Sequence, residues 1–258
     1  MSDHIFDDAQ LARCLAAAAG RHLLLLREQG LVPVSQLGKH GDRLANTLLT
    51  DLLRRHRPDD GLLSEEEAAD AARLDKSRVW IVDPVDGTRE YGEGRPDWAV
   101  HVGLVEDGFP AAACAVALPD LGLTFSSAVP LALPPAPAGS LKILVSRTRA
   151  PRIAQQLAQR LGAELVPMGS AGAKAMAVVR GEAHAYLHAG GQYEWDSCAP
   201  VGVALAAGLH ASRIDGSPCR YNQADVSMPD LLVCRPELAA LLLSTLAECL
   251  RHEEPEHV

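Results

Sequence analysis

The stretch from Val79 to Thr88 constrains this chain more than any other, because a short apolar run ends there in two carboxylates. Val79–Val82 is rich in β-branched and aromatic side chains, which predicts a buried strand. The proline between the carboxylates cannot donate to a sheet ladder, and the glycine after them tolerates backbone angles that other residues avoid. We therefore expect a turn that brings Asp83 and Asp86 together, where they repel each other unless a cation lies between them.

A pair of this kind suits Mg²⁺, which takes oxygen ligands, commonly one or two carboxylates completed by water and substrate phosphate. The letters Asp-Pro-Val-Asp-Gly-Thr also occur in ordinary turns, so the motif by itself leaves both interpretations open. Two other acidic segments favour the metal. Ser64-Glu65-Glu66-Glu67 follows a short apolar pair, and Glu194-Trp195-Asp196 ends an apolar stretch and opens a predicted helix.

Three motifs in this order resemble the inositol monophosphatase superfamily of Mg²⁺-dependent, lithium-sensitive phosphatases. They are Ser64-Glu65-Glu66, the stretch from Trp80 to Thr88, and Trp195-Asp196 followed by a helix of small residues. Their order and separation match that family over nearly the whole chain. Three further segments are more similar to the 3′(2′),5′-bisphosphate nucleotidase (CysQ-type) branch than to inositol monophosphatases: Thr88-Arg89-Glu90-Tyr91, Ser146-Arg147 and Gly169 to Lys174.

The resemblance implies an α+β fold with αβαβα layers, the sugar-phosphatase or inositol monophosphatase-like fold. Residues 1–128 would form an N-terminal α+β lobe with an antiparallel sheet that carries most metal ligands. Residues 140–258 would form a C-terminal α/β lobe that completes the site and the substrate pocket. Residues 129–139 contain four prolines and are the most linker-like stretch, so they mark the expected boundary.

Apolar periodicity places the expected elements along the chain. It predicts helices over residues 7–29, 42–56, 151–161, 170–180, 196–207 and 237–251. It predicts strands over residues 79–82, 98–105, 110–118, 123–125, 142–146, 164–167 and 183–188. The tight turns in the first half indicate an antiparallel sheet, and the alternation of strands with helices in the second half indicates a layered α/β lobe. Residues 36–41 are expected to form a loop, so Asp42 would lie in the first turn of its helix and could act as a cap.

The resemblance also implies the chemistry of a phosphate monoester hydrolase. Two or three Mg²⁺ ions would be held by Glu65, Asp83, Asp86, Asp196 and the backbone carbonyl of Val85. Glu65 and Thr88 would position water for in-line attack, and Asp42 would orient Thr88.

Substrate recognition would depend on other residues. The backbone N–H groups of Gly87 and Thr88, if they open a helix, can receive the scissile phosphate. The resemblance places Ser170, Lys174 and Arg147 near a second phosphate or a ribose, although a lysine on a helix is also a common solvated charge. If both cations contact the ligand, the expected substrate is 3′-phosphoadenosine 5′-phosphate (PAP) or the related PAPS of sulfate assimilation. Inositol phosphates, fructose 1,6-bisphosphate and a non-catalytic Mg²⁺- or nucleotide-binding regulator are the alternatives.

Composition limits which binding partners and which cellular location we expect. The net charge of −9 argues against binding of a nucleic acid polymer, which needs clustered Lys and Arg. No apolar run approaches the length of a membrane span. The six scattered cysteines and the lack of a secretory signal indicate free thiols in a reducing cytoplasm, and the resemblance implies a homodimer. His184 and His188 share a face of a predicted strand, but no third ligand is near, so we do not expect zinc.

Overall fold

A computed structural model describes residues 6–251 of the chain. Over these residues the helices are α1 (Asp8–Gln29), α2 (Val34–His56), α3 (Thr88–Gly92), α4 (Arg152–Leu161), α5 (Ala171–Val179), α6 (Glu194–Ala206) and α7 (Ala239–Arg251). None of these helices is long and apolar enough to cross a lipid bilayer.

The strands form two five-stranded sheets. The first sheet has the order β1-β2-β3-β4-β5, with strands β1 (Gly61–Ser64), β2 (Arg78–Asp86), β3 (Ala99–Glu106), β4 (Phe109–Leu118) and β5 (Leu123–Ser126). The second has the order β7-β6-β8-β10-β9, with strands β6 (Lys142–Ser146), β7 (Glu164–Met168), β8 (Ala185–Tyr193), β9 (His210–Ser212) and β10 (Ser227–Cys234). In the first sheet only β1 and β2 pair in parallel, whereas β6, β7 and β8 form a parallel block in the second.

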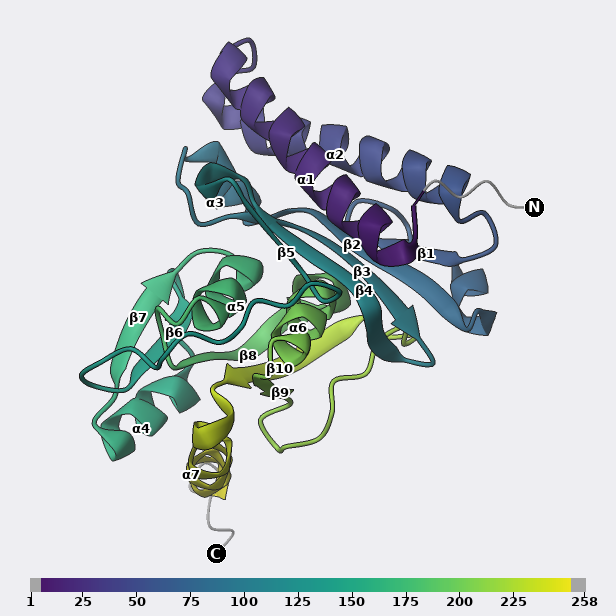
Figure 1. Cartoon of the computed structure of the whole chain (residues 1–258). Helices are drawn as coiled ribbons and strands as arrows, with labels where there is room; N and C mark the ends of the chain where they lie inside the picture. The colour runs from purple at the N-terminus through teal and green to yellow at the C-terminus, as the bar shows by residue number, and fades with distance from the viewer. Residues whose placement is uncertain (1–5, 252–258) are drawn as a thin grey trace, which may run out of the picture.

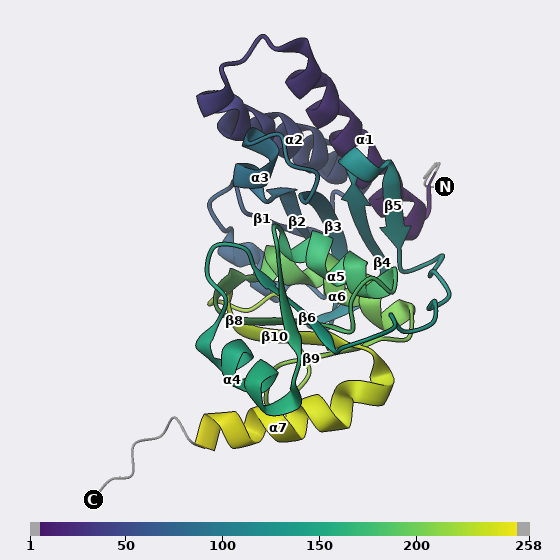
Figure 2. The same ribbon diagram turned by 90° about the vertical axis from the view of Figure 1, so that its left-hand side faces the viewer.

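Helices and sheets alternate in layers (Figures 1 and 2). Helices α1 and α2 cover the outer face of the first sheet, α5 and α6 lie between the sheets, and α4 and α7 cover the outer face of the second. The expected αβαβα fold is therefore confirmed. Among the described residues, three apolar cores hold the layers together: one lies between the outer helices α1 and α2 and the first sheet, one surrounds the middle helices between the two sheets, and one lies between the second sheet and α4 and α7.

The alternation of side chains along β2 explains how one strand serves two cores. Val79 and Ile81 pack toward the helices between the sheets, while Trp80 and Val82 pack toward α1 and α2. Because successive side chains of a strand point to opposite faces, Asp83 continues the row that faces the middle layer. The first carboxylate of the central motif is thus directed into the molecule.

Two strands are longer than the sequence predicts. Strand β2 continues past Val82 to Asp86, and its pairing with β3 is irregular between Asp83 and Asp86, which accommodates a proline without a ladder hydrogen bond. Strand β8 continues to Tyr193 through two glycines that we expected to leave the strand. The short strands β1 and β9 were not predicted, nor was β10, whose apolar run is interrupted by a proline and an aspartate.

Helix α2 begins at Val34, so the predictions of a loop over residues 36–41 and of Asp42 in the first turn are wrong. The reason is contact with α3. A Cβ atom on Gly38 would lie 2.7 Å from Thr88 Cγ2, and one on Gly41 would lie 2.6 Å from Tyr91 Cε1. The two glycines, which are poor helix formers in isolation, let α2 approach α3 closely.

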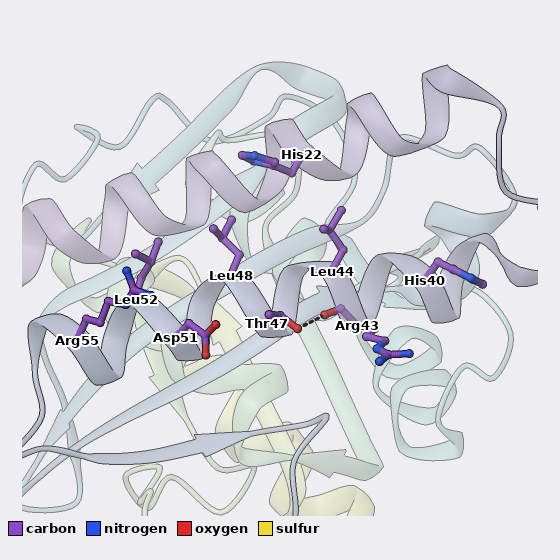
Figure 3. Close-up of a pocket in the computed structure, with 9 residues that line it drawn as sticks. All are labelled: His22, His40, Arg43, Leu44, Thr47, Leu48, Asp51, Leu52 and Arg55. Carbon is purple, nitrogen blue, oxygen red and sulfur yellow. Dashed lines mark hydrogen bonds between the residues drawn. The ribbon is translucent and has the colours of Figure 1, made fainter.

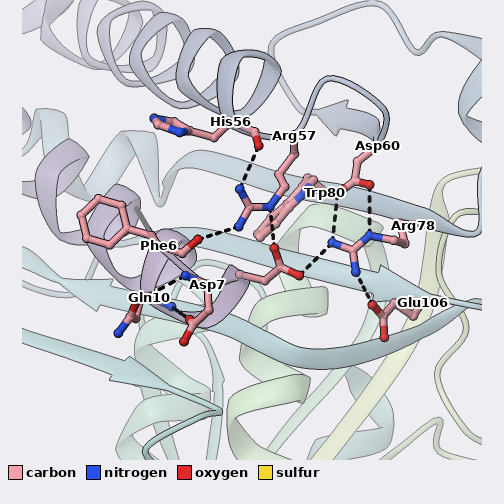
Figure 4. A network of polar contacts seen from close by, with 10 residues as sticks. Phe6, Asp7, Gln10, His56, Arg57, Asp60, Arg78, Trp80 and Glu106 are labelled. Carbon is pink, nitrogen blue, oxygen red and sulfur yellow. Dashed lines mark hydrogen bonds and ion pairs between the residues drawn. The ribbon is translucent and has the colours of Figure 1, made fainter. Parts of the chain in front are cut away.

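A polar network joins the start of α1 and the end of α2 to β2 (Figure 4). Arg78 pairs with Asp8 at 2.8 Å and with Asp60 at 3.0 Å, while Arg57 Nε donates to Asp8 at 2.5 Å. Trp80 Nε1 donates to Asp60 at 2.8 Å. These groups are only partly exposed and are linked in a network. They therefore hold α1 and α2 against the first sheet more strongly than isolated surface ion pairs would.

Candidate active site

Three carboxylates converge between the first sheet and the middle layer. Single carboxylate oxygens of Asp83, Asp86 and Asp196 all lie within 4.8 Å of one another. The first two residues end β2, and Asp196 lies in the first turn of α6, directly after β8. Asp83 is 1% exposed and Asp86 is 5% exposed.

Glu65 joins this cluster through the pairing of β1 with β2. Ser64 is opposite Val82, and Glu65 N donates to the Val82 carbonyl at 3.4 Å, so the side chain emerges beside Asp83. The Glu65 carboxyl lies within hydrogen-bonding reach of Asp83, although much of the residue is exposed. Glu194, in contrast, accepts from the backbone N–H groups of Asn222 and Gln223 and plays no part in the cluster.

The electrostatics of the cluster fit a divalent cation. Loss of hydration raises the pKa of Asp83 well above its ordinary value, and the neighbouring carboxylates raise it further. The same causes raise the pKa values of Glu65 and Asp196 to about 7. Because every donor is a carboxylate oxygen, the set suits a hard cation such as Mg²⁺. The cluster could therefore hold a metal.

Asp86 is held differently from its neighbours. Its carboxylate accepts from the backbone N–H groups of Ala171 and Gly172, at 3.1 and 2.6 Å, at the start of α5. Its Oδ2 also lies 3.1 Å from His101 Nε2. Burial alone would raise the pKa of Asp86, but His101 and the N–H groups outweigh it and lower the pKa.

His101 is a site residue that the sequence analysis missed. Its Nδ1 lies 3.0 Å from the carbonyl oxygen of Trp195, so the ring connects Asp86 with the residue before Asp196. Burial would lower the pKa of His101, but Asp86 outweighs this and raises it. A signal was present in the sequence: one histidine in an otherwise apolar strand needs a polar partner when it is buried.

Thr88 and Asp42 meet as the resemblance implies. The Thr88 hydroxyl lies 3.0 Å from Asp42 Oδ1 and 3.0 Å from the Val85 carbonyl oxygen, and its single hydrogen serves one acceptor at a time. Burial raises the pKa of Asp42 to about 7. Asp42 therefore contacts Thr88 from within α2 rather than capping that helix.

The expected substrate residues lie at the same edge, but their cations already have partners. Gly87 adopts φ 88° and precedes α3, and the Ser170 hydroxyl accepts from Ala173 N as the cap of α5. Lys174 is 4% exposed, and its ammonium donates to the carbonyls of Gly169 and Ser170. Arg147 Nη2 lies 2.8 Å from Glu90 and 2.9 Å from Glu93.

A cavity of about 720 Å³ lies away from these residues, in the open groove between α1 and α2 (Figure 3). Its lining includes Leu44, Leu48 and Leu52 with several polar residues, and none of the converging carboxylates. The cavity is therefore separate from the carboxylate cluster, which remains the candidate active site.

Comparison with known proteins identifies a family of phosphatases. The model of the inositol monophosphatase family matches residues 33–251. A protein of Mycobacterium leprae (strain TN) named 3′-phosphoadenosine 5′-phosphate phosphatase is 51% identical over 93% of this chain and 94% of its own length. The 3′(2′),5′-bisphosphate nucleotidase CysQ of Escherichia coli (strain K12) is 29% identical over 70% of this chain and 77% of its own. The crystal structure of inositol monophosphatase II from Staphylococcus aureus MSSA476 superposes with a TM-score of 0.79 and 21% identity, covering 96% of this chain and 98% of that one.

Proposed function

Because the chain belongs to the inositol monophosphatase family, we propose that it is a Mg²⁺-dependent phosphatase that removes the 3′-phosphate of PAP. The observation that carries this proposal is the convergence of Asp83, Asp86 and Asp196, which arrive from two distant parts of the chain. A relative named for this activity, 51% identical over nearly its full length, supports the choice of substrate.

The side chains of the site would have different roles. Asp83, Asp86, Asp196, Glu65 and the Val85 carbonyl would hold two or three Mg²⁺ ions. When bound, Mg²⁺ lowers the pKa of water and offsets the charge that develops on the phosphoryl oxygens. Thr88, while donating to Asp42, keeps lone pairs free to accept a hydrogen bond from the attacking water, and Glu65 can accept its proton.

The reaction needs no covalent intermediate with the protein. Gly87 and Thr88 present their backbone N–H groups at the start of α3, next to the carboxylates, where a phosphoryl oxygen would be received. With water on one side and the nucleoside oxygen on the other, displacement at phosphorus proceeds in line. The proposed products are adenosine 5′-phosphate and inorganic phosphate.

We extend the proposal to the setting of the enzyme. It would act in the cytoplasm, in sulfur assimilation, as a homodimer that is sensitive to lithium. Residues 1–128 would form the lobe with most metal ligands, and residues 140–258 would form the lobe that completes the substrate pocket.

A substrate panel tests the proposed function. Phosphate release from PAP, inositol 1-phosphate and fructose 1,6-bisphosphate is compared at equal concentration with Mg²⁺, with and without lithium. We expect PAP to be hydrolysed fastest and its product to be adenosine 5′-phosphate. Faster hydrolysis of inositol 1-phosphate or fructose 1,6-bisphosphate would reassign the substrate, and no hydrolysis of any of the three would indicate a binding protein.

Asp83→Asn is the matched variant for this panel. It keeps the acceptor for Val85 N but removes a charge from the cluster. We expect kcat/KM to fall by more than roughly 100-fold, beyond the usual cost of losing a group that only supports a metal ligand. In chelator the variant should melt no lower than the wild type, because a buried repulsion is relieved. Retained activity would contradict the proposed metal site.

A further inference from the structure

A third cation lies close in sequence to one of the two that the sequence analysis chose for a second phosphate. Lys174 and Arg147 are both engaged by groups of the protein itself. Arg149 lies two residues beyond Arg147, is exposed, and makes no hydrogen bond or ion pair with any residue between 6 and 251. Its guanidinium is therefore free to bind a ligand.

Arg149 lines a cavity of about 290 Å³. The other lining residues are Ser146, Thr148, His188, Ala189 and Gly190. Ligand pockets usually measure about 300 to 1,000 Å³, so this cavity suits a phosphorylated sugar rather than a whole nucleotide.

The topology places this cavity at the edge of the second sheet that faces the carboxylate cluster. Strands β6 and β8 are parallel, so Ser146 at the end of β6 lies on the same side as His188 in β8. Strand β7 is parallel to β6, and α5 follows it at the same edge. The first N–H groups of α5 bind Asp86, so one edge carries both the cavity and part of the metal cluster.

The lining offers polar groups that suit a ribose phosphate. The Ser146 and Thr148 hydroxyls lie 3.4 Å apart. His188 Nε2 is buried and has no hydrogen-bond partner among the described residues. A guanidinium beside two hydroxyls matches a phosphate, because its planar fork can donate two parallel hydrogen bonds to phosphate oxygens.

His188 contributes a hydrogen bond rather than a charge. Burial lowers its pKa to about 4, with help from Lys174 and Arg149. The ring is therefore neutral near pH 7, with one nitrogen as donor and the other as acceptor. This suits a sugar hydroxyl.

We propose that Arg149, with Ser146, Thr148 and His188, binds the second phosphate and the adjoining ribose of a bisphosphorylated substrate. This inference rests on the proposed function and names the residues that separate such a substrate from a monophosphate. Arg147 and Lys174 keep their partners within the protein. Arg147 holds the segment after β6 in place, and Lys174 holds the start of α5 in place.

The test compares two substrates that differ only in the second phosphate. The substrates are PAP and adenosine 3′-phosphate, and the variant is Arg149→Met. A hydrogen-bonded charge pair accounts for roughly a 10- to 100-fold change in affinity, so KM for PAP should rise by about that factor while kcat is nearly unchanged. The kinetic constants for adenosine 3′-phosphate should not change. His188→Gln should raise KM for both substrates, because both carry the ribose.

Two arginine controls make the test specific. Arg152→Met removes a charge three residues away, from a residue outside this cavity, and should affect neither substrate. Arg147→Met should not discriminate between the two substrates. Equal effects of Arg149→Met on both substrates, or discrimination by Arg147→Met, would overturn the inference while leaving PAP as the substrate. Failure of the wild type to hydrolyse either adenylate would instead overturn the proposed function.

Discussion

At the scale of single residues, His101 shows how a buried polar group depends on a missing side chain. A Cβ atom on Gly172 would lie 2.1 Å from His101 Nε2, so only glycine lets the ring reach Asp86. The ring in turn lies between Asp86 and the Trp195 carbonyl. His101 is therefore a positioning residue that aligns two of the three converging carboxylates.

Replacement of His101 by alanine should weaken Mg²⁺ binding. The change leaves Asp86 without its imidazole partner, and loss of such a supporting group costs roughly 10- to 100-fold in metal affinity. We expect the Mg²⁺ concentration for half-maximal activity to rise by about this factor, with most of kcat recovered at saturating Mg²⁺. Activity measured against Mg²⁺ concentration gives both quantities.

Two variants distinguish positioning from loss of packing. His101→Asn keeps a donor and should recover part of the Mg²⁺ affinity. Gly172→Ala retains the histidine but displaces its ring, and should resemble His101→Ala. An unchanged Mg²⁺ requirement in both alanine variants would refute the role of His101.

At the scale of elements, the approach of α2 to α3 decides where Asp42 meets Thr88. Leu37 and Ala45 are buried in the apolar core between α1, α2 and the first sheet, while Gly38 faces Thr88. The 3.0 Å contact between Thr88 and Asp42 thus depends on a helix packed directly against the turn that carries the metal ligands.

Gly38→Ala should separate activity from stability. Alanine favours the helix by about 1 kcal/mol over glycine, but its Cβ would lie 2.7 Å from Thr88 Cγ2. We expect the melting temperature to change little because the two effects oppose each other, while kcat falls because Thr88 is displaced. Ser35→Ala, at an exposed position of the same helix, is the control and should alter neither quantity. Full activity in Gly38→Ala would show that the contact is not needed.

At the scale of the whole molecule, acidic groups from both halves of the chain gather around the end of β2. Asp42, Glu65 and Asp196 each have a pKa raised to about 7, mainly by loss of hydration. A carboxyl whose pKa is raised by folding stabilises the folded state below its unfolded pKa of about 4, and that stabilisation is lost as the pH rises through 7. The metal-free protein therefore loses stability from this cluster on going from acid to neutral pH.

Mg²⁺ should stabilise the protein more at pH 8 than at pH 5.5, because the ion needs ionised carboxylates. His188, with a pKa lowered to about 4, has the opposite effect: its contribution makes the folded state more stable as the pH rises from about 4 to 6.5. The measurement is therefore the difference between melting temperatures with Mg²⁺ and with chelator at each pH, in which that contribution cancels. Asp196→Asn should reduce the difference at pH 8. A difference independent of pH would contradict the assignment of these groups to the metal.

Much of this site could be predicted from the sequence, because its main features are local. The motif from Asp83 to Thr88 brings two carboxylates together, although it does so as the irregular end of β2 rather than as the expected turn. Glu65 and Asp196 also follow apolar runs. Errors arose where local preference was overruled by packing. Residues 36–41 contain two glycines and read as a loop, yet they are helical because α3 lies against them.

The sequence by itself determined the acidic motifs, the hairpins of the first sheet and the alternation of strands and helices in the second half. Only the tertiary structure decided which charges face one another. It brought His101 to Asp86, buried the ammonium of Lys174, engaged Arg147 with Glu90 and Glu93, and left Arg149 free beside a cavity. Contacts between residues far apart in the chain depend on how the layers stack, and this information is not contained in any local pattern.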